Sequence, residues 1–557
     1  MRKLATGLAC AAVLVSTACQ DALDVQNKNQ PDIARSYSTP AVLDQLIATG
    51  YAQIQNGLFG SSTSTLPTLL VWAFESYGTV ANFGMQLHAA LPRGYLDNSR
   101  NNFTFAENFR DFSQMSQQAR YSANYVQGLD AIVATGQHLS NPTGAASDAQ
   151  TLPGIDARAR AFAFFENGVA LGSLALVYDS AAIVTPATPA TDVPPLSAYA
   201  DVMKAALASL DTAIAIGGSA TAAPGFPLPT TYIALPSGSY TQDQFVRLVR
   251  SYKARFRAGV ARTPADRAAA DWSAIIADAT NGIASDLVIQ ISSSAGWPLS
   301  FEGSQMFASN SSGWHEVPPM IYGMADTSGG YQSFVSVPTT ARTYFLIKTP
   351  DKRFPSGEDR TAQQKNSPST WTYTAFPYMR NRAGADPPGD GWGSSYYDFW
   401  RFKGIFDSPS RVGPWIEMAK VEIDMLAAEG YIRNKDYASA ATLINKSRTK
   451  AGLPAVTATA DGGNTGSACV PRVPTSAGNT TKCGDIMEAM KWEKRMETAY
   501  TGYGQWYFDS RGWGDLAEGT PLQYPVPYQE MDARAKPFYN LGGVGGQSGA
   551  AKGTYGF

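Results

Sequence analysis

Histidine and cysteine are scarce in this chain of 557 residues, which has three of the former and four of the latter. The histidines, His88, His138 and His315, are scattered, so the sequence predicts no His-rich metal site. The chain also has no His-Glu-x-x-His helix, no phosphate-binding glycine loop with lysine and no Gly-x-Ser-x-Gly turn. We therefore predict no metal, no cofactor and no catalytic residue.

Charge of either sign is also sparse. Charged residues make up 16% of the chain, and 44 Lys and Arg against 46 Asp and Glu give a net charge of −2. Residues 1–18 contain Arg2 and Lys3 but no acid, so the remainder carries −2 minus 2, or −4. Without a basic field the chain lacks the electrostatic footprint of nucleic-acid binding, and we expect no nucleic-acid partner.

Long hydrophobic runs are absent after the first few residues. The apolar run 4–15 follows two basic residues and leads to Ser16-Thr-Ala-Cys19, the pattern of a lipoprotein export signal. No later segment reaches the roughly 18 uninterrupted apolar residues of a spanning helix. We interpret 1–18 as a signal peptide and Cys19 as the lipidated first residue of the mature chain. Simple secretion, or cleavage near Cys10, is the alternative.

The rest of the chain has enough apolar surface for one large globular unit. Residues 19–36 are rich in Gln, Asn, Asp and Lys and predict a flexible tether before it. Apolar residues make up 44% and aromatic residues 11% of the chain, which predicts a single domain over 37–557. Helical spacing of apolar residues predicts helices over 40–59, 107–138, 156–178, 197–214, 241–257 and 272–282.

Two of these predicted helices carry further signals. The helix 156–178 is apolar on nearly all sides, which predicts burial, and Glu166 and Asn167 at its middle argue against a membrane span. Thr241-x-x-Gln244 is a capping-box pattern at the start of the predicted helix 241–257. Because the rest of the sequence is not basic, we expect the cations of the helix 241–257 to form a solvated face and not a phosphate site. These are Arg247, Arg250, Lys253, Arg255 and Arg257.

The texture of the sequence changes between 285 and 413. Helical periodicity fades and Gly, Ser and Pro multiply. Aromatic residues at this density pack or bind something, so the segment is not disordered. We predict a loop-rich insert here, between an N-terminal helical part at 37–284 and C-terminal helix pairs at 414–530. Five of the eleven tryptophans lie in it: Trp297, Trp314, Trp371, Trp392 and Trp400.

The stretch after the insert predicts two helices joined by a short turn. In the first, which starts at Trp415, apolar residues recur at helical spacing, and Gly430 is predicted to be its C-terminal cap. Glu422 and Glu429 stand seven residues apart on a neighbouring line. The second helix begins near Asp436 and ends in a Gly-Leu-Pro stop. A hairpin of this size indicates a repeat unit that stacks on others.

This helix pair resembles the signature of the SusD/RagB family of outer-membrane nutrient-binding lipoproteins. The resemblance rests on 421–429, 440–445 and 448–454, and on a second match at 486–500 and 504–514. In the second match a Glu-Arg-x-x-Glu helix leads to an aromatic-Asp turn and an Arg-Trp-Gly. The positions that approximate this motif are Glu493, Arg495, Glu497, Trp506, Asp509 and Arg511.

The resemblance implies a mainly α-helical fold of tetratricopeptide-like helix pairs, a SusD-like α-α superhelix, in which a loop-rich insert builds much of the ligand face. It also implies lipid anchoring in the outer membrane at the cell surface, and a TonB-dependent outer-membrane barrel of SusC type as partner. The chain departs from the family motif at Lys494, which lies between Glu493 and Arg495, and at Thr501-Gly502, where the family has Glu-Gly.

Two acidic groups have competing interpretations. Glu493 and Glu497 resemble a glycosidase dyad, but they lie four apart on a predicted helix beside Lys494 and Arg495, which favours structural ion pairs. The segment 386–390, Asp-Pro-Pro-Gly-Asp, offers carboxylates to calcium. Too few ligands lie in line there, so we predict an ordinary turn.

Cys469 and Cys483 remain once the leader and the lipidated cysteine are set aside. They flank a loop rich in Gly, Pro, Ser, Thr and Asn, and the export signal places them in an oxidising compartment. We predict that they form a disulfide, worth on the order of 3 kcal/mol in the chain-entropy model. Two free thiols are the alternative.

Binding is the function that these features favour. Sugar rings pack their C–H faces on flat aromatic side chains, while sugar hydroxyls need polar partners at the rim. We predict that an early stretch and the insert converge into one surface platform for the ligand, with core packing as the competing interpretation of each aromatic. The platform residues are Trp72, Tyr77, Asn82, Trp297, Trp314 and Tyr322.

We therefore predict a cell-surface, lipid-anchored protein that captures a glycan or peptide and delivers it to the TonB-dependent barrel without chemistry. A surface glycan-cleaving enzyme and a helical-repeat assembly protein without a small ligand are the alternatives. Turnover of a polysaccharide without added hydrolase marks the first alternative. A protein partner without saccharide or peptide binding marks the second.

Overall fold

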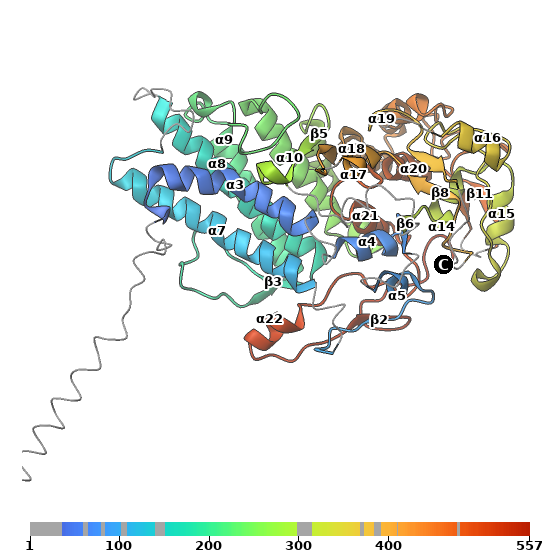
Figure 1. Cartoon of the computed structure of the whole chain (residues 1–557), viewed down its shortest axis with the longest axis horizontal. Coiled ribbons are helices and arrows are strands. Elements are labelled where there is room, and N and C mark those ends of the chain that lie inside the picture. Colours follow the sequence, from blue (N-terminus) through green and yellow to red (C-terminus); the bar gives the residue numbers. More distant parts are fainter. Residues whose placement is uncertain are drawn as a thin grey trace, which may run out of the picture.

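The chain is mainly helical. The computed structural model describes residues 36–59, 65–78, 84–101, 108–139, 151–297, 315–367, 373–383, 391–408, 410–475 and 479–557. Helices dominate this part of the chain, and its strands form only two-stranded antiparallel pairs (Figure 1). The fold class predicted from the sequence is confirmed.

The N-terminal part packs long helices around one buried helix. α8 (Thr151–Val177) packs against α3 (Pro40–Phe59), α7 (Asn108–Ala134) and α9 (Tyr199–Gly217), on the left of Figure 1. In the described chain α8 is the one helix long and apolar enough to cross a membrane, and 89% of its most apolar window is buried inside the protein. The prediction of a buried core helix is confirmed.

Two further helices lead from this bundle to the C-terminal part. They are α10 (Gln242–Gly259) and α12 (Trp272–Thr280), which pack against each other. At the start of α10, the amide of Gln244 donates to the Thr241 hydroxyl and the amide of Thr241 donates to the Gln244 side chain. The predicted capping box is therefore present, and it fixes where α10 begins.

The C-terminal part contains the predicted helix pair, α18 (Lys420–Arg433) and α19 (Tyr437–Lys450). α18 packs against α10, α12 and α19, and also against α20 (Ile486–Thr498). α21 (Gln505–Trp513) follows α20 and contacts α10. α18 therefore connects the N-terminal bundle to the C-terminal helices.

The first helix of this pair starts later than its sequence predicts. Residues Gly413–Met418 form the strand β9, which pairs with β5 (Leu287–Ile291), and Trp415 lies opposite Ile289. Five of the six β9 residues are buried. A strand buried on both faces has no alternation, so its apolar residues read as a continuation of the helical pattern.

The same helix also ends later than predicted. Gly430 lies inside α18, which continues to Arg433 and has Asn434 as its C-cap. A Cβ at Gly430 would lie 2.7 Å from a side-chain carbon of Ile276 and 3.2 Å from one of Trp272. The glycine therefore allows α12 to approach α18 closely, and it has no capping role.

Short elements fill the remaining described segments. The helices are α4 (Leu66–Trp72), α5 (Met85–Ala89), α11 (Pro264–Ala268), α14 (Pro319–Tyr322), α15 (Gly330–Val335), α16 (Arg360–Lys365), α17 (Lys403–Asp407) and α22 (Tyr528–Ala533). The 3-10 turns are η2 (Ala223–Gly225), η3 (Ser293–Ala295), η4 (Gly323–Ala325) and η5 (Thr339–Ala341). The other strand pairs are β1 (Tyr77–Gly78) with β6 (His315–Glu316), β2 (Tyr95–Leu96) with β12 (Leu541–Gly542), β3 (Ser180–Ala182) with β4 (Leu196–Ala198), β7 (Met379–Asn381) with β8 (Tyr397–Phe399), and β10 (Arg472–Pro474) with β11 (Thr481–Cys483).

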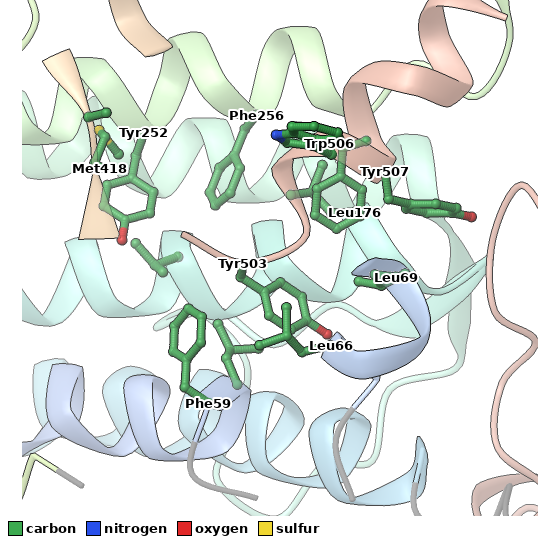
Figure 2. Packing of buried hydrophobic residues seen from close by; sticks show 14 of the residues in the cluster. Phe59, Leu66, Leu69, Leu176, Tyr252, Phe256, Met418, Tyr503, Trp506 and Tyr507 are labelled. Atoms are coloured by element: carbon green, nitrogen blue, oxygen red, sulfur yellow. The ribbon is translucent and has the colours of Figure 1, made fainter. Parts of the chain in front are cut away.

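The hydrophobic core is shared by elements from distant parts of the chain. Figure 2 shows part of this core, in which Phe59 of α3, Phe256 of α10 and Trp506 of α21 belong to one cluster of buried side chains. Phe59 also contacts Trp415 of β9 edge-to-face, with ring centroids 4.7 Å apart. Each helix face is therefore buried by partners that are far away in sequence.

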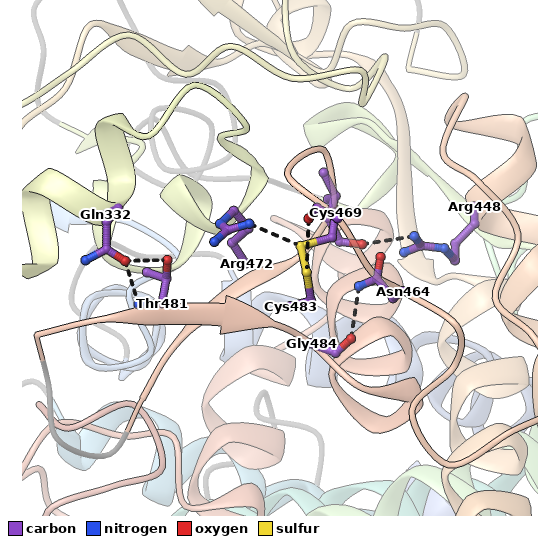
Figure 3. Close-up of a disulfide and its surroundings, with 10 residues drawn as sticks. Gln332, Arg448, Asn464, Cys469, Arg472, Thr481, Cys483 and Gly484 are labelled. Carbon is purple, nitrogen blue, oxygen red and sulfur yellow. Dashed lines mark hydrogen bonds between the residues drawn. A yellow bond between two sulfur atoms is a disulfide. The ribbon is translucent and has the colours of Figure 1, made fainter.

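A disulfide joins Cys469 to Cys483, the pairing that the sequence predicted (Figure 3). Cys483 ends β11, one strand of the hairpin β10–β11. The side chain of Gln332 in α15 accepts hydrogen bonds from the amide and hydroxyl of Thr481, both at 2.7 Å. The loop between α19 and α20 is thereby attached to the insert.

Buried ion pairs fix the position of α18. Arg255 of α10 binds Glu422 with two hydrogen bonds of 2.7 and 2.8 Å. Arg267 of α11 binds Glu429 in the same two-pronged way, at 3.0 and 2.5 Å, and also reaches Asp509 of α21 at 3.1 Å. All five side chains are buried. The two glutamates seven residues apart on α18 are thus its attachment points to the neighbouring helices.

The cationic face of α10 is not the solvated face that its sequence predicts. Arg250, Lys253 and Arg257 all reach Asp278 of α12, at 3.2, 3.4 and 3.3 Å. Lys253 is buried, as is Arg255. Arg247 instead pairs with Asp243 of α10 itself and keeps 37% of its side-chain surface exposed. The other four cations face acids on α9, α12, α18 and β9, which are more distant in the sequence.

The Glu493 and Glu497 carboxylates of α20 are held in structural ion pairs, as predicted. Their partner is Arg353 of the insert, whose nitrogens lie 3.0 Å from Glu493 and 3.4 Å from Glu497. The adjacent Lys494 instead pairs with Asp509 at 2.7 Å. These pairs attach the insert to α20.

The Arg267–Glu429 pair generates a prediction about stability and pH. Burial alone raises the pKa of Glu429, but the Arg267 guanidinium outweighs burial and lowers this pKa to about 2. The folded pKa thus lies below the ordinary value of 4.5, so the ionised carboxylate stabilises the fold fully above that pH. This stabilisation is lost as the pH falls toward 2.

We expect Glu429→Gln to lower the free energy of unfolding by about 3–5 kcal/mol at pH 7, because it removes the main counter-charge of a buried arginine. Urea denaturation measures this loss, and the gap between wild type and variant should narrow below pH 4.5. Asp532→Asn is the control, because its partner Arg100 keeps 64% of its side-chain surface exposed. Equal losses in the two variants would contradict the structural role of the buried pair.

Candidate functional site

The described members of the predicted aromatic platform are core residues. Trp72, Tyr77, Trp297 and Tyr322 retain 2, 3, 3 and 0% of their accessible surface. Trp297 packs edge-to-face on Tyr51 of α3, with ring centroids 5.7 Å apart. The prediction that these four form a surface platform is wrong, because neighbouring helices and the insert cover them. Asn82 and Trp314 lie outside the described residues.

The two stretches that were predicted to converge do meet. Strand β1, with Tyr77, pairs with β6, and the Tyr322 hydroxyl donates to the backbone oxygen of Glu75 at 3.2 Å. Tyr322 also stacks on Trp506 of α21, with centroids 5.2 Å apart. The early stretch and the insert are therefore joined under the surface.

A surface cleft of about 500 Å³ lies over this junction. We call it the aromatic cleft. Five segments of the chain contribute to it: the segment before β2, two segments of the insert, the segment after α21 and the C-terminal end. The lining residues are Leu91, Pro92, Pro338, Thr339, Thr340, Gly391, Trp392, Ala517, Glu518, Val544 and Phe557.

Trp392 and Phe557 are the aromatic rings of the cleft. Trp392 packs edge-to-face on Tyr77 at 5.2 Å, and Phe557 packs edge-to-face on Phe74 at 5.3 Å. A Cβ at Gly393 would lie 2.3 Å from the Tyr77 ring, so this glycine allows the insert to lie against β1. Tyr77 therefore supports the cleft wall from behind and does not form its surface.

Polar groups lie beside these rings. Thr339 and Thr340 of η5 bring two hydroxyls, and Glu518 brings an exposed carboxylate. Hydroxyl and carboxylate groups next to flat aromatic surfaces are suited to a sugar ring, which needs both apolar and hydrogen-bonding contacts. The cleft can therefore bind a polar ring-shaped ligand without further groups.

Ionisable residues behind the cleft are tuned by burial. Burial raises the pKa of Glu75 to about 8, although the Tyr500 amide donates to its carboxyl group at 2.6 Å. Burial also lowers the pKa of His88 to about 4 and that of Arg93 to about 9. At neutral pH the buried carboxyl and imidazole groups are thus uncharged, whereas Arg93 remains a cation that binds backbone oxygens.

The described part of the chain contains no candidate metal site. No group of three or more His, Cys, Asp or Glu side chains there is arranged to hold a metal ion. The segment 386–390, which was considered for calcium, lies outside the described residues.

Solved structures with the same fold place this geometry in context. A SusD superfamily protein from Parabacteroides distasonis matches 88% of the chain and 97% of its own length, with a TM-score of 0.54 and 12% identity. A second, from Bacteroides vulgatus, matches 89% and 97%, with a TM-score of 0.53 and 13% identity. A third, from Bacteroides thetaiotaomicron, matches 88% and 98%, with a TM-score of 0.50 and 12% identity.

The chain has the SusD fold. At this level of identity the likeness concerns the fold, and it extends over nearly the whole described chain. No family model and no curated protein matches the sequence. The SusD-like helical scaffold includes the α18–α19 pair, from which the resemblance to the SusD/RagB signature was first inferred.

Sequence reasoning missed most of the residues that line the cleft of this SusD-like protein. Trp392 was noted only as one of the insert tryptophans. Its one distinguishing signal is the flanking pair Gly391 and Gly393, because a Cβ at Gly391 would lie 2.1 Å from the backbone oxygen of Arg342. Thr339, Thr340 and Phe557 have no sequence signal, since only the folded chain brings them together.

The buried platform residues generate a prediction about stability. We expect Trp297→Ala to lower the free energy of unfolding by about 3–5 kcal/mol, because it leaves a cavity in the core. Ligand affinity of the remaining folded protein should not change. Chemical denaturation and binding assays on the same samples measure both, and Tyr121→Ala, at a ring that is 41% exposed, is the control. A loss of affinity at unchanged stability would restore Trp297 to the binding surface.

Proposed function

We propose that this SusD-like protein is a cell-surface, lipid-anchored binding protein that captures a glycan or other oligomeric nutrient in the aromatic cleft. It then delivers the ligand to a TonB-dependent outer-membrane transporter. The observation that carries the proposal is the aromatic cleft itself, which unites the early stretch, the insert and the C-terminal end on a SusD fold.

The chemistry of the cleft supports a glycan as the ligand. Phe557, which is partly exposed, offers apolar ring surface beside the small exposed part of Trp392, while the hydroxyls of Thr339 and Thr340 and the Glu518 carboxylate offer hydrogen-bond partners. A glycan presents both kinds of surface on every sugar ring. A volume of about 500 Å³ is within the range of small-molecule sites.

Binding without catalysis is part of the proposal. Glycoside hydrolysis needs two carboxyl groups that flank the scissile bond. Glu518 is the one Asp or Glu among the described residues that line the cleft, and Glu493 and Glu497 are buried under Arg353. This arrangement supports a receptor over the alternative of a surface glycan-cleaving enzyme.

The anchor and the partner rest on the sequence. Residues 1–35, which include Cys19 and most of the tether, lie outside the described part of the structure. Lipidation of Cys19 would hold the protein on the outer membrane, and the tether would let it move over a barrel of SusC type. In this arrangement the protein acts as a lid that passes its ligand inward.

A variant that blocks the cleft tests the binding site. We expect Thr340→Trp to weaken binding of the oligosaccharide identified by screening at least about tenfold, because an indole at this exposed position fills the cleft and removes a hydroxyl partner. Ser336→Trp places the same side chain at an exposed position outside the cleft and is the control. Calorimetric titration measures both, and unchanged affinity in Thr340→Trp would locate the ligand elsewhere.

The transporter partner is tested directly in the membrane. We expect a tagged protein, purified in mild detergent from its own membranes, to carry a large TonB-dependent barrel in near-equal amount, as identified by mass spectrometry. A membrane-bound protein recovered intact without that barrel would contradict the uptake role. Release of sugar from a polysaccharide by the purified protein would instead favour the enzyme.

A further inference from the structure

A second cavity adjoins the aromatic cleft. The segment 516–518 lines both, since Leu516 faces the second cavity while Ala517 and Glu518 line the cleft. The second cavity has a volume of about 530 Å³. Its walls are two buried arginines, Arg262 and Arg511, together with the start of α11 and the C-terminal segment 549–554. We call it the arginine cavity.

Both arginines are held in place by helix ends. Arg262 donates hydrogen bonds of 2.6, 2.6 and 3.1 Å to three carbonyl oxygens at the C-terminal end of α8. Arg511 donates to the last carbonyl of α10 at 2.8 Å and to that of Leu522 at 2.9 Å. The two side chains are therefore fixed, and they retain only 3 and 1% of their accessible surface.

Neither guanidinium forms a close ion pair in the described structure, although the charge of Asp179 acts on Arg262 from farther away. Arg267 and Arg353, which are also buried, each bind at least two carboxylates, whereas Arg262 and Arg511 form no ion pair with any described residue. The Nε atoms of Arg262 and Arg511 also lack a hydrogen-bond partner. Backbone carbonyls supply only partial charges, so two buried positive charges remain incompletely balanced.

The two charges are close to each other. Both Nη1 atoms approach the carbonyl oxygen of Leu522, at 3.4 Å from Arg262 and 2.9 Å from Arg511. Burial, and then the charge of Arg262, hold the pKa of Arg511 well below its usual range. Burial also lowers the pKa of Arg262 to about 10. An anion near these groups would offset the cost of burying the two cations and reduce the repulsion between them.

The remaining walls of the cavity favour an anion as well. Lys552 is a third, exposed cation, and no Asp or Glu occurs among the described lining residues. The backbone amides of Ala551, Lys552 and Gly553 donate no hydrogen bond within the described structure. Pro264, Leu516 and Leu522 add apolar surface.

We propose that the arginine cavity binds a carboxylate-bearing organic anion about the size of one sugar ring. The guanidinium groups and Lys552 balance the carboxylate, the free amides donate to it, and the apolar wall packs on the carbon skeleton. A neutral molecule of the same shape would leave the arginine charges unbalanced. The cavity is thus selective for acids, and it is a separate site from the aromatic cleft.

Matched pairs of small probes test the charge selectivity. We expect glucuronate to bind at least about tenfold more tightly than glucose, or N-acetylalanine more tightly than N-acetylalaninamide, in calorimetric titrations at low salt. Discrimination in the first pair identifies a sugar acid as the ligand, and discrimination in the second identifies a peptide terminus. Either result supports the proposal, and equal binding of acid and neutral partner in both pairs overturns it.

Variants locate the acid without disturbing the helix ends. Substituting Arg262 or Arg511 would also remove contacts that hold α8 and α10, so exposed positions on the cavity wall are used. We expect Ala551→Trp, which fills the cavity, to abolish acid binding, and Lys552→Gln to weaken it about threefold. Lys536→Gln, an exposed change elsewhere, is the control.

The cleft-blocking variant Thr340→Trp distinguishes binding in the aromatic cleft from binding in the arginine cavity. Thr340→Trp should leave acid binding unchanged, and Ala551→Trp should leave binding of a neutral oligosaccharide unchanged. Acid binding that survives Ala551→Trp but fails in Thr340→Trp would overturn the assignment to the arginine cavity. A wrong assignment of the acid to the arginine cavity can therefore be told apart from a wrong assignment of the oligosaccharide to the aromatic cleft.

Discussion

The buried pair of Arg267 and Glu429 is the interaction on which the arrangement of this protein depends. Desolvating two charges is costly, and only good geometry and further hydrogen bonds offset that cost. Here the guanidinium meets the carboxylate with two hydrogen bonds and also reaches Asp509. One arginine thereby sets the positions of α11, α18 and α21 relative to one another. The C-terminal segment that follows α21 then lines both the aromatic cleft and the arginine cavity.

Arginine has two different roles in this fold. Where it meets acids, as Arg353 meets Glu493 and Glu497, the charges cancel and the contact is structural. Where it meets backbone carbonyls and aromatic rings without a close acid, as Arg262 and Arg511 do, the side chain still joins helices but its charge stays incompletely balanced. The first role explains why the acids four apart on α20 lie in ion pairs with the insert. The second explains why we expect the arginine cavity to bind acids more tightly than neutral molecules.

Much of the helical scaffold follows from local sequence. The capping box at Thr241 and the apolar helix α8 were predictable because backbone hydrogen bonding and helical periodicity act over a few residues. The errors occurred where distant packing decides. The residues before α18 are a strand because β5 is beside them, and Gly430 stays helical because α12 needs the space of its missing side chain. Lys253 and Arg255 of α10 are buried for the same kind of reason, since their acids come from other elements.

The sequence by itself determined the helical class, the resemblance to the SusD/RagB signature and the pairing of the two late cysteines. It also showed that an early stretch and the insert hold an unusual number of aromatic rings. Only the tertiary structure decided which rings are buried. Trp72 and Trp297 are packed by helices. Trp392 is also buried, with 5% of its surface exposed, but it borders a cleft in which Phe557 stays partly exposed, because η5 and the C-terminal residues lie beside it. Composition records how many rings a chain has, but exposure depends on contacts between residues hundreds of positions apart.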